Sequence, residues 1–192
     1  MSEQVYLCSP GDLLASILSK GKSFQQLYLL SAASSAGKTT WCFEFVTQAR
    51  EAGLKVAGLL SPAVFNGEEK IGIDLLDLSS QMKRSLASRS NEKKPHASLC
   101  GAWIFNQETL TWGNHCLQNL ENADILVLDE IGLLEFIHAQ GLMAGLQLLD
   151  SGSYPVALVT IRPSLLETAR QRWPHSQVIV VSKDNTTPGG EL

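Results

Sequence analysis

Residues 27–60 read LYLLSAASSAGKTTWCFEFVTQAREAGLKVAGLL, and they contain the clearest signals of secondary structure in the sequence. An apolar run at 27–30, too short for a helix, leads into a turn of small residues and an uninterrupted helical segment at 38–52, which Gly53 ends. A second apolar run covers 56–60. Two buried strands joined by a helix within about thirty residues form a parallel βαβ unit. The stretch therefore predicts an α/β fold with a mostly parallel sheet and helices on both faces.

The turn before the helix, AASSAGKT at 32–39, fits the phosphate-binding pattern G-x-x-x-x-G-K-[ST], with Ala32 in place of the first glycine. In that pattern backbone N–H groups surround phosphates at the positive end of the helix. We expect Lys38 to reach the outer phosphates and the Thr39 hydroxyl to hold Mg²⁺. The alternative is a serine-rich turn that contains a lysine by chance, but its place between strand and helix favours phosphate binding. The predicted nucleotide-binding residues are Ala33, Ser34, Ser35, Ala36, Gly37, Lys38, Thr39 and Thr40.

Residues 123–130, ADILVLDE, place two carboxylates after another buried strand. The carboxyl ends of parallel strands face the ligand, so Asp129 is expected beside Thr39, where it would orient the magnesium and its waters. Glu130 is the candidate to orient and deprotonate an attacking water. The alternative is that these are two solvated acids after a strand. The phosphate-binding pattern around Lys38 in the same chain makes this the less favoured interpretation.

The loop GKTT at 37–40 and the segment DEIGLLE at 129–135 resemble the small nucleoside-triphosphatase family first associated with thermophiles, a RecA-like branch of P-loop enzymes. Family members carry D-E-I-G-K-M-E, so Leu133 replaces the family's lysine. A second family stretch is Thr-Pro-Glu-Val-Arg, followed by Gly and Arg and then by Gly-Phe-x-Ile-x-Asp-Leu. It is similar to residues 61–78, with Phe65 where the arginine of Thr-Pro-Glu-Val-Arg is usual. Asn185-Thr186 corresponds to a family Asn-Arg pair, so the resemblance spans about residues 27–185.

The resemblance implies a three-layer P-loop fold and Mg²⁺-dependent hydrolysis of ATP or GTP to the diphosphate and phosphate. Lys38 and Glu130 are then the catalytic residues, and Thr39 and Asp129 the metal ligands. The lost basic positions put phosphate affinity, turnover or a charged partner surface in question. Two alternatives use the same loop: a small-molecule or nucleotide kinase with residues 79–98 as a lid, and a nucleotide-binding switch or assembly protein with incidental hydrolysis.

The other segments complete a single predicted domain, 1–192, with a hairpin insertion near 61–80. Ser9-Pro10-Gly11-Asp12 is typical of a helix start and predicts a helical extension at 1–24. Asn66-Gly67 is a turn signal that predicts a hairpin between 64–65 and 71–78, before a polar, mobile surface loop at 79–98. The remaining predictions are regular structure at 99–105, helices at 107–122, 139–149 and 163–172, strands at 125–128, 156–160 and 178–181, and a flexible tail at 183–192.

Further polar residues follow the predicted strands. Thr160 is expected either to contact the terminal phosphate or attacking water, or to hydrogen-bond the backbone. Arg162 is the internal candidate to neutralise transition-state charge, with a plain surface arginine as the alternative. Arg84 and Arg89 could act similarly if their loop folds over the nucleotide, and Glu135 is expected to support the magnesium site or cap the next helix.

No catalytic or binding role is predicted for three of the tryptophans and two of the histidines. The tryptophans are expected in the core rather than stacked on a base. Two of the four histidines, His138 and His175, have no partners at a catalytic spacing and are expected to be solvated. The residues concerned are Trp103, Trp112, Trp173, His138 and His175.

Composition narrows the class of protein. Among 192 residues, 15 Lys+Arg and 19 Asp+Glu give a net charge of −4, and 44% are hydrophobic, which excludes a disordered polymer. No run approaches the ~20 apolar residues of a membrane helix, and the start lacks an export signal. The basic residues form no stripe for nucleic acid.

These exclusions predict a cytoplasmic protein whose partner is a nucleoside triphosphate; a protein partner or oligomer stays open. The cysteines are far apart with no C-x-x-C pair, and they are expected to be reduced thiols because no export signal is predicted. His115-Cys116 is the only adjacent pair of soft ligands, which is too few for a metal site. The four cysteines are Cys8, Cys42, Cys100 and Cys116.

Overall fold

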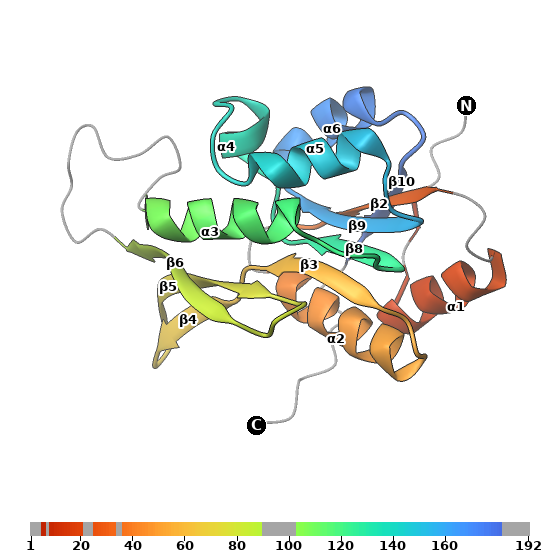
Figure 1. Cartoon of the computed structure of the whole chain (residues 1–192), viewed down its shortest axis with the longest axis horizontal. Coiled ribbons are helices and arrows are strands. Elements are labelled where there is room, and N and C mark those ends of the chain that lie inside the picture. The colour runs from red at the N-terminus through yellow and green to blue at the C-terminus, as the bar shows by residue number, and fades with distance from the viewer. Residues whose placement is uncertain (1–4, 7, 21–24, 34–35, 90–102, 182–192) are drawn as a thin grey trace.

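The computed structural model describes residues 5–6, 8–20, 25–33, 36–89 and 103–181. In these residues one ten-stranded sheet passes through the middle of the molecule, with helices on both faces (Figure 1). Its strand order is β1-β10-β2-β9-β8-β3-β5-β6-β7, and β4 pairs with β5. The predicted α/β layering is confirmed.

Six neighbouring strands form the parallel part of the sheet. They are β1 (Val5–Tyr6), β10 (Gln177–Val180), β2 (Gln26–Ser31), β9 (Val156–Ile161), β8 (Ile125–Leu128) and β3 (Val56–Leu60). Strands β2, β9, β8 and β3 are buried along their whole length, because helices cover both faces. Their carboxyl ends lie at one edge of the sheet, which is where the predicted site residues follow.

The predicted hairpin is confirmed and belongs to an antiparallel extension of the sheet. It consists of β4 (Ala63–Asn66), β5 (Glu69–Asp77), β6 (Lys83–Arg89) and β7 (Trp103–Phe105). Strand β5 joins β3 only through its last residues, since Leu76 and Asp77 pair with Leu60 and Leu59. The earlier residues of β5, with β4, therefore continue past the carboxyl end of β3.

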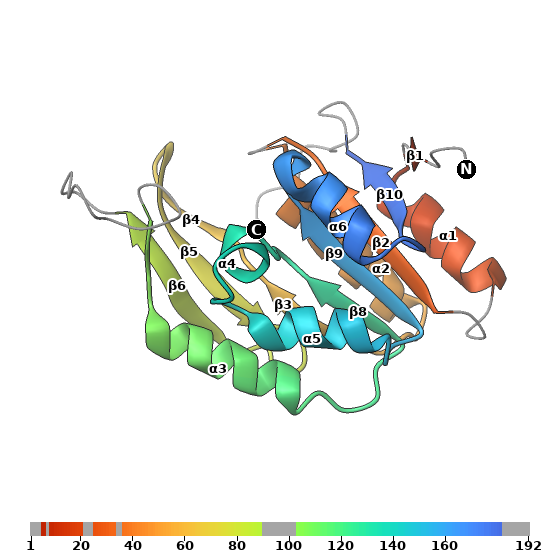
Figure 2. The same ribbon diagram turned by 90° about the horizontal axis from the view of Figure 1, so that it is seen from above.

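Two hydrophobic cores lie on the two faces of the sheet. Successive residues of β2 point into opposite cores. Leu30 packs with α1 (Pro10–Lys20) and α2 (Lys38–Glu51), while Leu29 packs on the opposite face. That face is covered by α3 (Gln107–Gln118), α5 (Met143–Ser151) and α6 (Leu166–Arg172), as Figure 2 shows from above. Two one-turn helices, α4 (Leu133–Phe136) and a 3₁₀ turn (Pro163–Leu165), complete this layer.

The predicted start of α1 is confirmed by its cap. The Ser9 hydroxyl accepts a 3.2 Å hydrogen bond from the Asp12 N–H, and the Asp12 carboxylate accepts one of 3.0 Å from the Ser9 N–H. The expectation of a purely helical extension is incomplete, because β1 joins the sheet beside β10. Residues 1–4, 7 and 21–24 of the extension, and the predicted tail at 183–192, lie outside the described residues.

The predicted surface loop at 79–98 is wrong over residues 83–89, which form β6. In β6 only Leu86 and Ala87 are buried, so the sequence shows none of the alternation that marks a half-buried strand. Residues 90–98 lie outside the described residues, as do 99–102 of the regular structure predicted at 99–105. Residues 83–89, which the kinase alternative would use as part of a lid, thus belong to the sheet.

Three predicted helices have different limits in the structure. The helix predicted at 107–122 ends at Gln118, and the one predicted at 163–172 divides into the 3₁₀ turn and α6. The one predicted at 139–149 begins at Met143, because Ala139 and Gly141 have φ angles of 49° and 80°, outside the helical region, and α4 stands separately before it. None of the helices in the described ranges has the length and apolar character needed to cross a membrane.

Candidate active site

The phosphate-binding pattern lies where the sequence predicts it, between β2 and α2. Gly37 has a φ of 83°, a left-handed conformation that glycine adopts without strain, and it turns the chain into the helix. The N-cap residue Gly37 has no side chain to cap α2, so among the described residues the first N–H groups keep their partial positive charge. Ser34 and Ser35, two of the predicted nucleotide-binding residues, lie outside the described residues.

Lys38 folds back over this loop. Its Nζ donates hydrogen bonds to the carbonyl oxygens of Ala32, at 3.1 Å, and Ala33, at 3.4 Å. The side chain is buried, with 9% of its surface exposed. The ammonium group is therefore held above the loop by neutral acceptors, which an anionic ligand can replace with a stronger, charge-assisted bond.

Asp129 lies just beyond β8 and is 3% exposed. Its two carboxylate oxygens are bound from different elements: the Thr39 hydroxyl in α2 donates to Oδ2 at 2.7 Å, and the Thr160 hydroxyl in β9 donates to Oδ1 at 2.7 Å. The Ser61 hydroxyl donates to the carbonyl oxygen of Asp129. The structure thus brings the predicted loop and the predicted acidic strand into direct contact.

Burial raises the pKa of the Asp129 carboxyl, and the neighbouring charge of Glu130 adds to this effect. The hydroxyls of Thr160 and Thr39 and the Ser61 N–H lower the pKa, but their effect is smaller than that of burial. Desolvation dominates because few groups compensate a charge taken out of water. The carboxylate therefore gains from a cation that binds beside it.

Thr160 has a third role, different from the two expected ones. Thr160 is fully buried, and its hydroxyl donates to the Asp129 carboxylate rather than to a backbone carbonyl oxygen. Sequence reasoning placed Thr160 at the correct edge of the sheet. The sequence does not predict the hydrogen bond to Asp129, because it does not show that β8 and β9 are neighbours in the sheet.

Glu130 points to a different partner from its neighbour Asp129. Its Oε1 accepts a hydrogen bond from Nε of Arg162, which follows β9, and the two side chains form an ion pair. Both side chains are partly exposed, whereas Asp129 is buried. The structure therefore places Arg162 next to the carboxylate for which the sequence predicts a catalytic role.

Glu135 caps the next helix, as one of its two expectations states. Its Oε2 accepts a 2.8 Å hydrogen bond from the Gly132 N–H at the start of α4, and its Oε1 one of 2.7 Å from the Leu142 N–H. Burial raises the pKa of this carboxyl, outweighing the hydrogen bonds, which lower it. Glu135 thereby ties the segment after Glu130 to the start of α5.

Lys70, in β5, is a residue that sequence reasoning missed. Its charge interacts with those of Glu130, Arg162, Asp129 and Lys38, so it belongs to the same electrostatic environment. A signal existed in the sequence: between Gly67 and Gly72, where the related family stretch carries arginine, Lys70 is the basic residue. The register of the hairpin, which brings it to the site, is not visible in the sequence.

Other predicted candidates have partners in the antiparallel extension or the core. Arg84 stacks on the Trp112 ring with its guanidinium carbon 4.6 Å from the ring centre, and Arg89 forms a 2.7 Å ion pair with Glu69. Both lie in β6 rather than in a loop folded over the nucleotide. Trp173 is buried, as expected, and its Nε1 donates to Asp150.

The cysteines that the structure describes are free thiols, as predicted, and burial raises the pKa of each. They are Cys8, Cys42 and Cys116, while Cys100 lies outside the described residues. Over the described ranges, no group of three or more His, Cys, Asp and Glu side chains could hold a metal ion.

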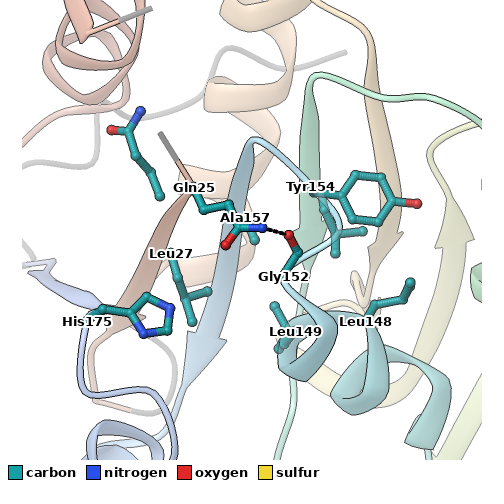
Figure 3. A pocket seen from close by; sticks show the side chains of 10 residues that line it. Gln25, Leu27, Leu148, Leu149, Gly152, Tyr154, Ala157 and His175 are labelled. Atoms are coloured by element: carbon teal, nitrogen blue, oxygen red, sulfur yellow. Dashed lines mark hydrogen bonds between the residues drawn. The ribbon is translucent and has the colours of Figure 1, made fainter. Parts of the chain in front are cut away.

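A pocket of about 330 Å³, including space open to solvent, lies at the other edge of the sheet. It is lined by the first residues of β2, by Ala157 at the start of β9 and by the end of α5, with His175 and Tyr154 at its sides (Figure 3). Gln25 crosses it and donates to the Gly152 carbonyl oxygen. Because it lies at the amino ends of the parallel strands, it is separate from the site around Asp129.

Comparison with known proteins agrees with this geometry. A family model described as NTPase matches residues 27–187. The nucleoside-triphosphatase THEP1 of Methanopyrus kandleri is 27% identical over 111 residues, which cover 56% of this chain and 58% of that protein. The chain thus spans less than two thirds of the length of this curated relative.

Two solved structures share the fold. The solution structure of a human cancer-related nucleoside triphosphatase has a TM-score of 0.64 and 25% identity, covering 83% of this chain and 90% of the other. The crystal structure of THEP1 from the hyperthermophile Aquifex aeolicus has a TM-score of 0.62 and 17% identity, covering 83% and 92%. These likenesses confirm the predicted P-loop fold.

Proposed function

This chain belongs to the NTPase family, and on that premise we propose that it hydrolyses a nucleoside triphosphate, ATP or GTP, to the diphosphate and phosphate. The observation that carries the proposal is the 2.7 Å hydrogen bond between Thr39 and the buried Asp129. It joins the phosphate-binding pattern at the start of α2 to the acidic strand β8. An exposed pair of acids after a strand, the alternative interpretation, would have no such contact.

We propose that Mg²⁺ binds with the nucleotide, held by Thr39 and Asp129. The donors fit this ion, because it prefers oxygen ligands and takes only one or two from protein, with phosphates and waters completing its shell. Asp129 is a buried carboxylate without a cation in an ion pair among the described residues, so the dication would relieve an unfavourable charge. When bound, Mg²⁺ supplies neutralisation of the phosphate charge.

The protein's own residues would position the reactants. The N–H groups at the start of α2 and the Lys38 ammonium bind the phosphates, with Lys38 leaving the carbonyls of Ala32 and Ala33. Glu130 orients a water and takes its proton as the water oxygen bonds to the terminal phosphorus. The bond from that phosphorus to the bridging oxygen breaks, and its electrons remain on the diphosphate. Rate enhancement then comes chiefly from positioning and charge stabilisation.

Phosphate release tests this proposal with Mg²⁺ and either ATP or GTP, for the wild type, Lys38→Ala and Glu130→Gln. We expect Lys38→Ala to lose nucleotide binding, and Glu130→Gln to bind nucleotide while losing turnover. Equal turnover in the wild type and Glu130→Gln would contradict the role of Glu130. A wild type that binds nucleotide without releasing phosphate would favour the switch alternative, and phosphate transfer only with an acceptor would favour the kinase.

A further inference from the structure

Lys70 is a charged side chain beside the site that the proposed reaction does not yet use. It lies near the start of β5, in the part of the hairpin that continues past the carboxyl end of β3. The Asp74 N–H still donates to the carbonyl oxygen of Pro62 at 2.9 Å, so the hairpin remains attached to the chain leaving β3. This arrangement carries Lys70 to the sheet edge that also holds Asp129 and Glu130.

The partner of Lys70 in the described structure is an aromatic ring. Its Nζ lies 5.1 Å from the centre of the Trp103 ring, and among the described residues it makes neither a hydrogen bond nor an ion pair. The side chain is half-buried, and burial lowers its pKa, while the charges of Glu130 and Asp129 raise it. A partly desolvated ammonium over a ring keeps its hydrogen-bond donors available for an anion.

The charges around Lys70 identify which anion fits. Lys38, Lys70 and Arg162 supply three cations, against the two carboxylates of Asp129 and Glu130. Lys38 and the first turn of α2 approach the phosphates from the loop, whereas Lys70 comes from the hairpin, where its charge interacts with Glu130 and Arg162. Those two residues mark the side where the attacking water is expected, next to the terminal phosphate.

We propose that Lys70 binds the terminal phosphate of the nucleoside triphosphate, so that the β4–β5 hairpin forms part of the nucleotide site. This inference rests on the proposed function. It assigns Lys70 a contact that a triphosphate has and a diphosphate lacks. Lys70 is then a residue that distinguishes substrate from product, and its effect on binding can be separated from that of the loop.

The test compares the affinities of a triphosphate and a diphosphate for the full chain, by calorimetric titration with Mg²⁺. The probes are AMP-PNP and ADP, or GMP-PNP and GDP if the wild type prefers guanine. We expect Lys70→Gln to weaken binding of the triphosphate analogue about tenfold or more, since a charge-assisted bond is lost, and to change diphosphate binding less than twofold. Lys70→Arg should restore most of the affinity, because it keeps the charge.

Lys83→Gln is the matched control, since Lys83 lies in the same extension and pairs with Asp74 at 3.2 Å. It should leave both affinities unchanged. In a Lys70→Gln variant that unfolds in urea at the wild-type concentration, equal weakening of both nucleotides, or no weakening, overturns the inference. Wild-type binding without phosphate release overturns the proposed hydrolysis alone, because a selective loss in Lys70→Gln would still support the phosphate contact.

Discussion

The Thr160 hydroxyl donates a 2.7 Å hydrogen bond to Oδ1 of Asp129, and both side chains are buried. Thr39 binds the other carboxylate oxygen at the same distance. Two hydroxyls from β9 and α2 thus fix the carboxylate in one orientation. Hydrogen bonds that orient a metal-binding carboxylate before the ion binds reduce the free-energy cost of ordering that carboxylate on binding.

Replacing Thr160 by valine should weaken Mg²⁺-dependent turnover because the carboxylate loses one of these hydroxyls. We expect about a tenfold fall in apparent Mg²⁺ affinity in phosphate-release assays, together with a loss of about 1–2 kcal/mol in the free energy of unfolding. Thr111→Val is a suitable control, because Thr111 lies exposed in α3 and binds only the Gln107 carbonyl oxygen. Unchanged Mg²⁺ dependence in Thr160→Val would contradict the orienting role.

Arg162→Ala should lower kcat more than it raises KM. The guanidinium is paired with Glu130 and lies where charge develops on the terminal phosphate in the proposed reaction. We expect kcat to fall about a hundredfold or more, as for other lost transition-state donors, and Arg162→Lys to recover part of it. Steady-state phosphate release at saturating nucleotide measures this effect.

The control for Arg162 is Arg172→Ala, which removes the 2.5 Å ion pair with Asp150 between α6 and α5. This change should leave kcat within about twofold, because the pair lies away from the site and a partly exposed pair contributes little. If Arg162→Ala has the same kcat as the wild type, the ion pair with Glu130 is only a surface contact.

The central fold could be predicted because its signals are local. Strands β3 and β8 coincide with apolar runs bounded by polar residues or turns, and α2 with an uninterrupted segment. Strand β6 could not be predicted, because its stability comes from pairing with β5 and β7 rather than from its own sequence. The same limit explains the late start of α5: Ala139 and Gly141 both have positive φ, and the alanine gives no signal of this in the sequence.

The site divides in the same way. The positions of Lys38, Thr39 and Asp129 follow from two short motifs and the parallel arrangement of their strands. The contacts of Thr160 and Arg162 depend on β9 being the neighbour of β8, and that of Lys70 depends on the register between β3 and β5. Sheet order and strand register are long-range properties. A single sequence therefore shows which polar residues follow each strand but not which of them come into contact.

Glu135 should make stability depend on pH in a defined direction. Burial raises its pKa in the folded state above the ordinary glutamate value of about 4.3. The folded protein then holds the proton at pH values where the unfolded chain has lost it. The contribution is fully present below the unfolded pKa and is lost as pH rises through the folded pKa.

Urea unfolding of the wild type and Glu135→Gln between about pH 4 and 7 isolates this effect, because glutamine resembles the protonated carboxyl. The free energy of unfolding of the wild type should fall relative to that of the variant as pH rises. Glu121→Gln, at an exposed position, should show no such trend. A wild type that gains stability over Glu135→Gln with rising pH would mean that the two backbone hydrogen bonds outweigh burial.

Gly58→Ala should be among the most damaging single changes in the sheet. Gly58 has a φ of 122° in β3, and a Cβ placed there would lie 1.9 Å from the carbonyl oxygen of Val127 in β8. Backbone atoms cannot move aside as a flexible side chain can, so the two strands would have to separate. We expect a loss of more than about 3 kcal/mol in the free energy of unfolding, or failure to fold.

Gly67→Ala separates this clash from the cost of the backbone conformation alone. Gly67 has a φ of 60° in the hairpin turn, and a Cβ there would have no atom within 4 Å. Only the left-handed conformation is then penalised, at about 1–2 kcal/mol. Urea unfolding and soluble yield measure both variants, and equal losses would show that β3 and β8 can separate without cost. A far greater loss for Gly58→Ala would instead mean that folding requires the close approach of β3 and β8 at Gly58.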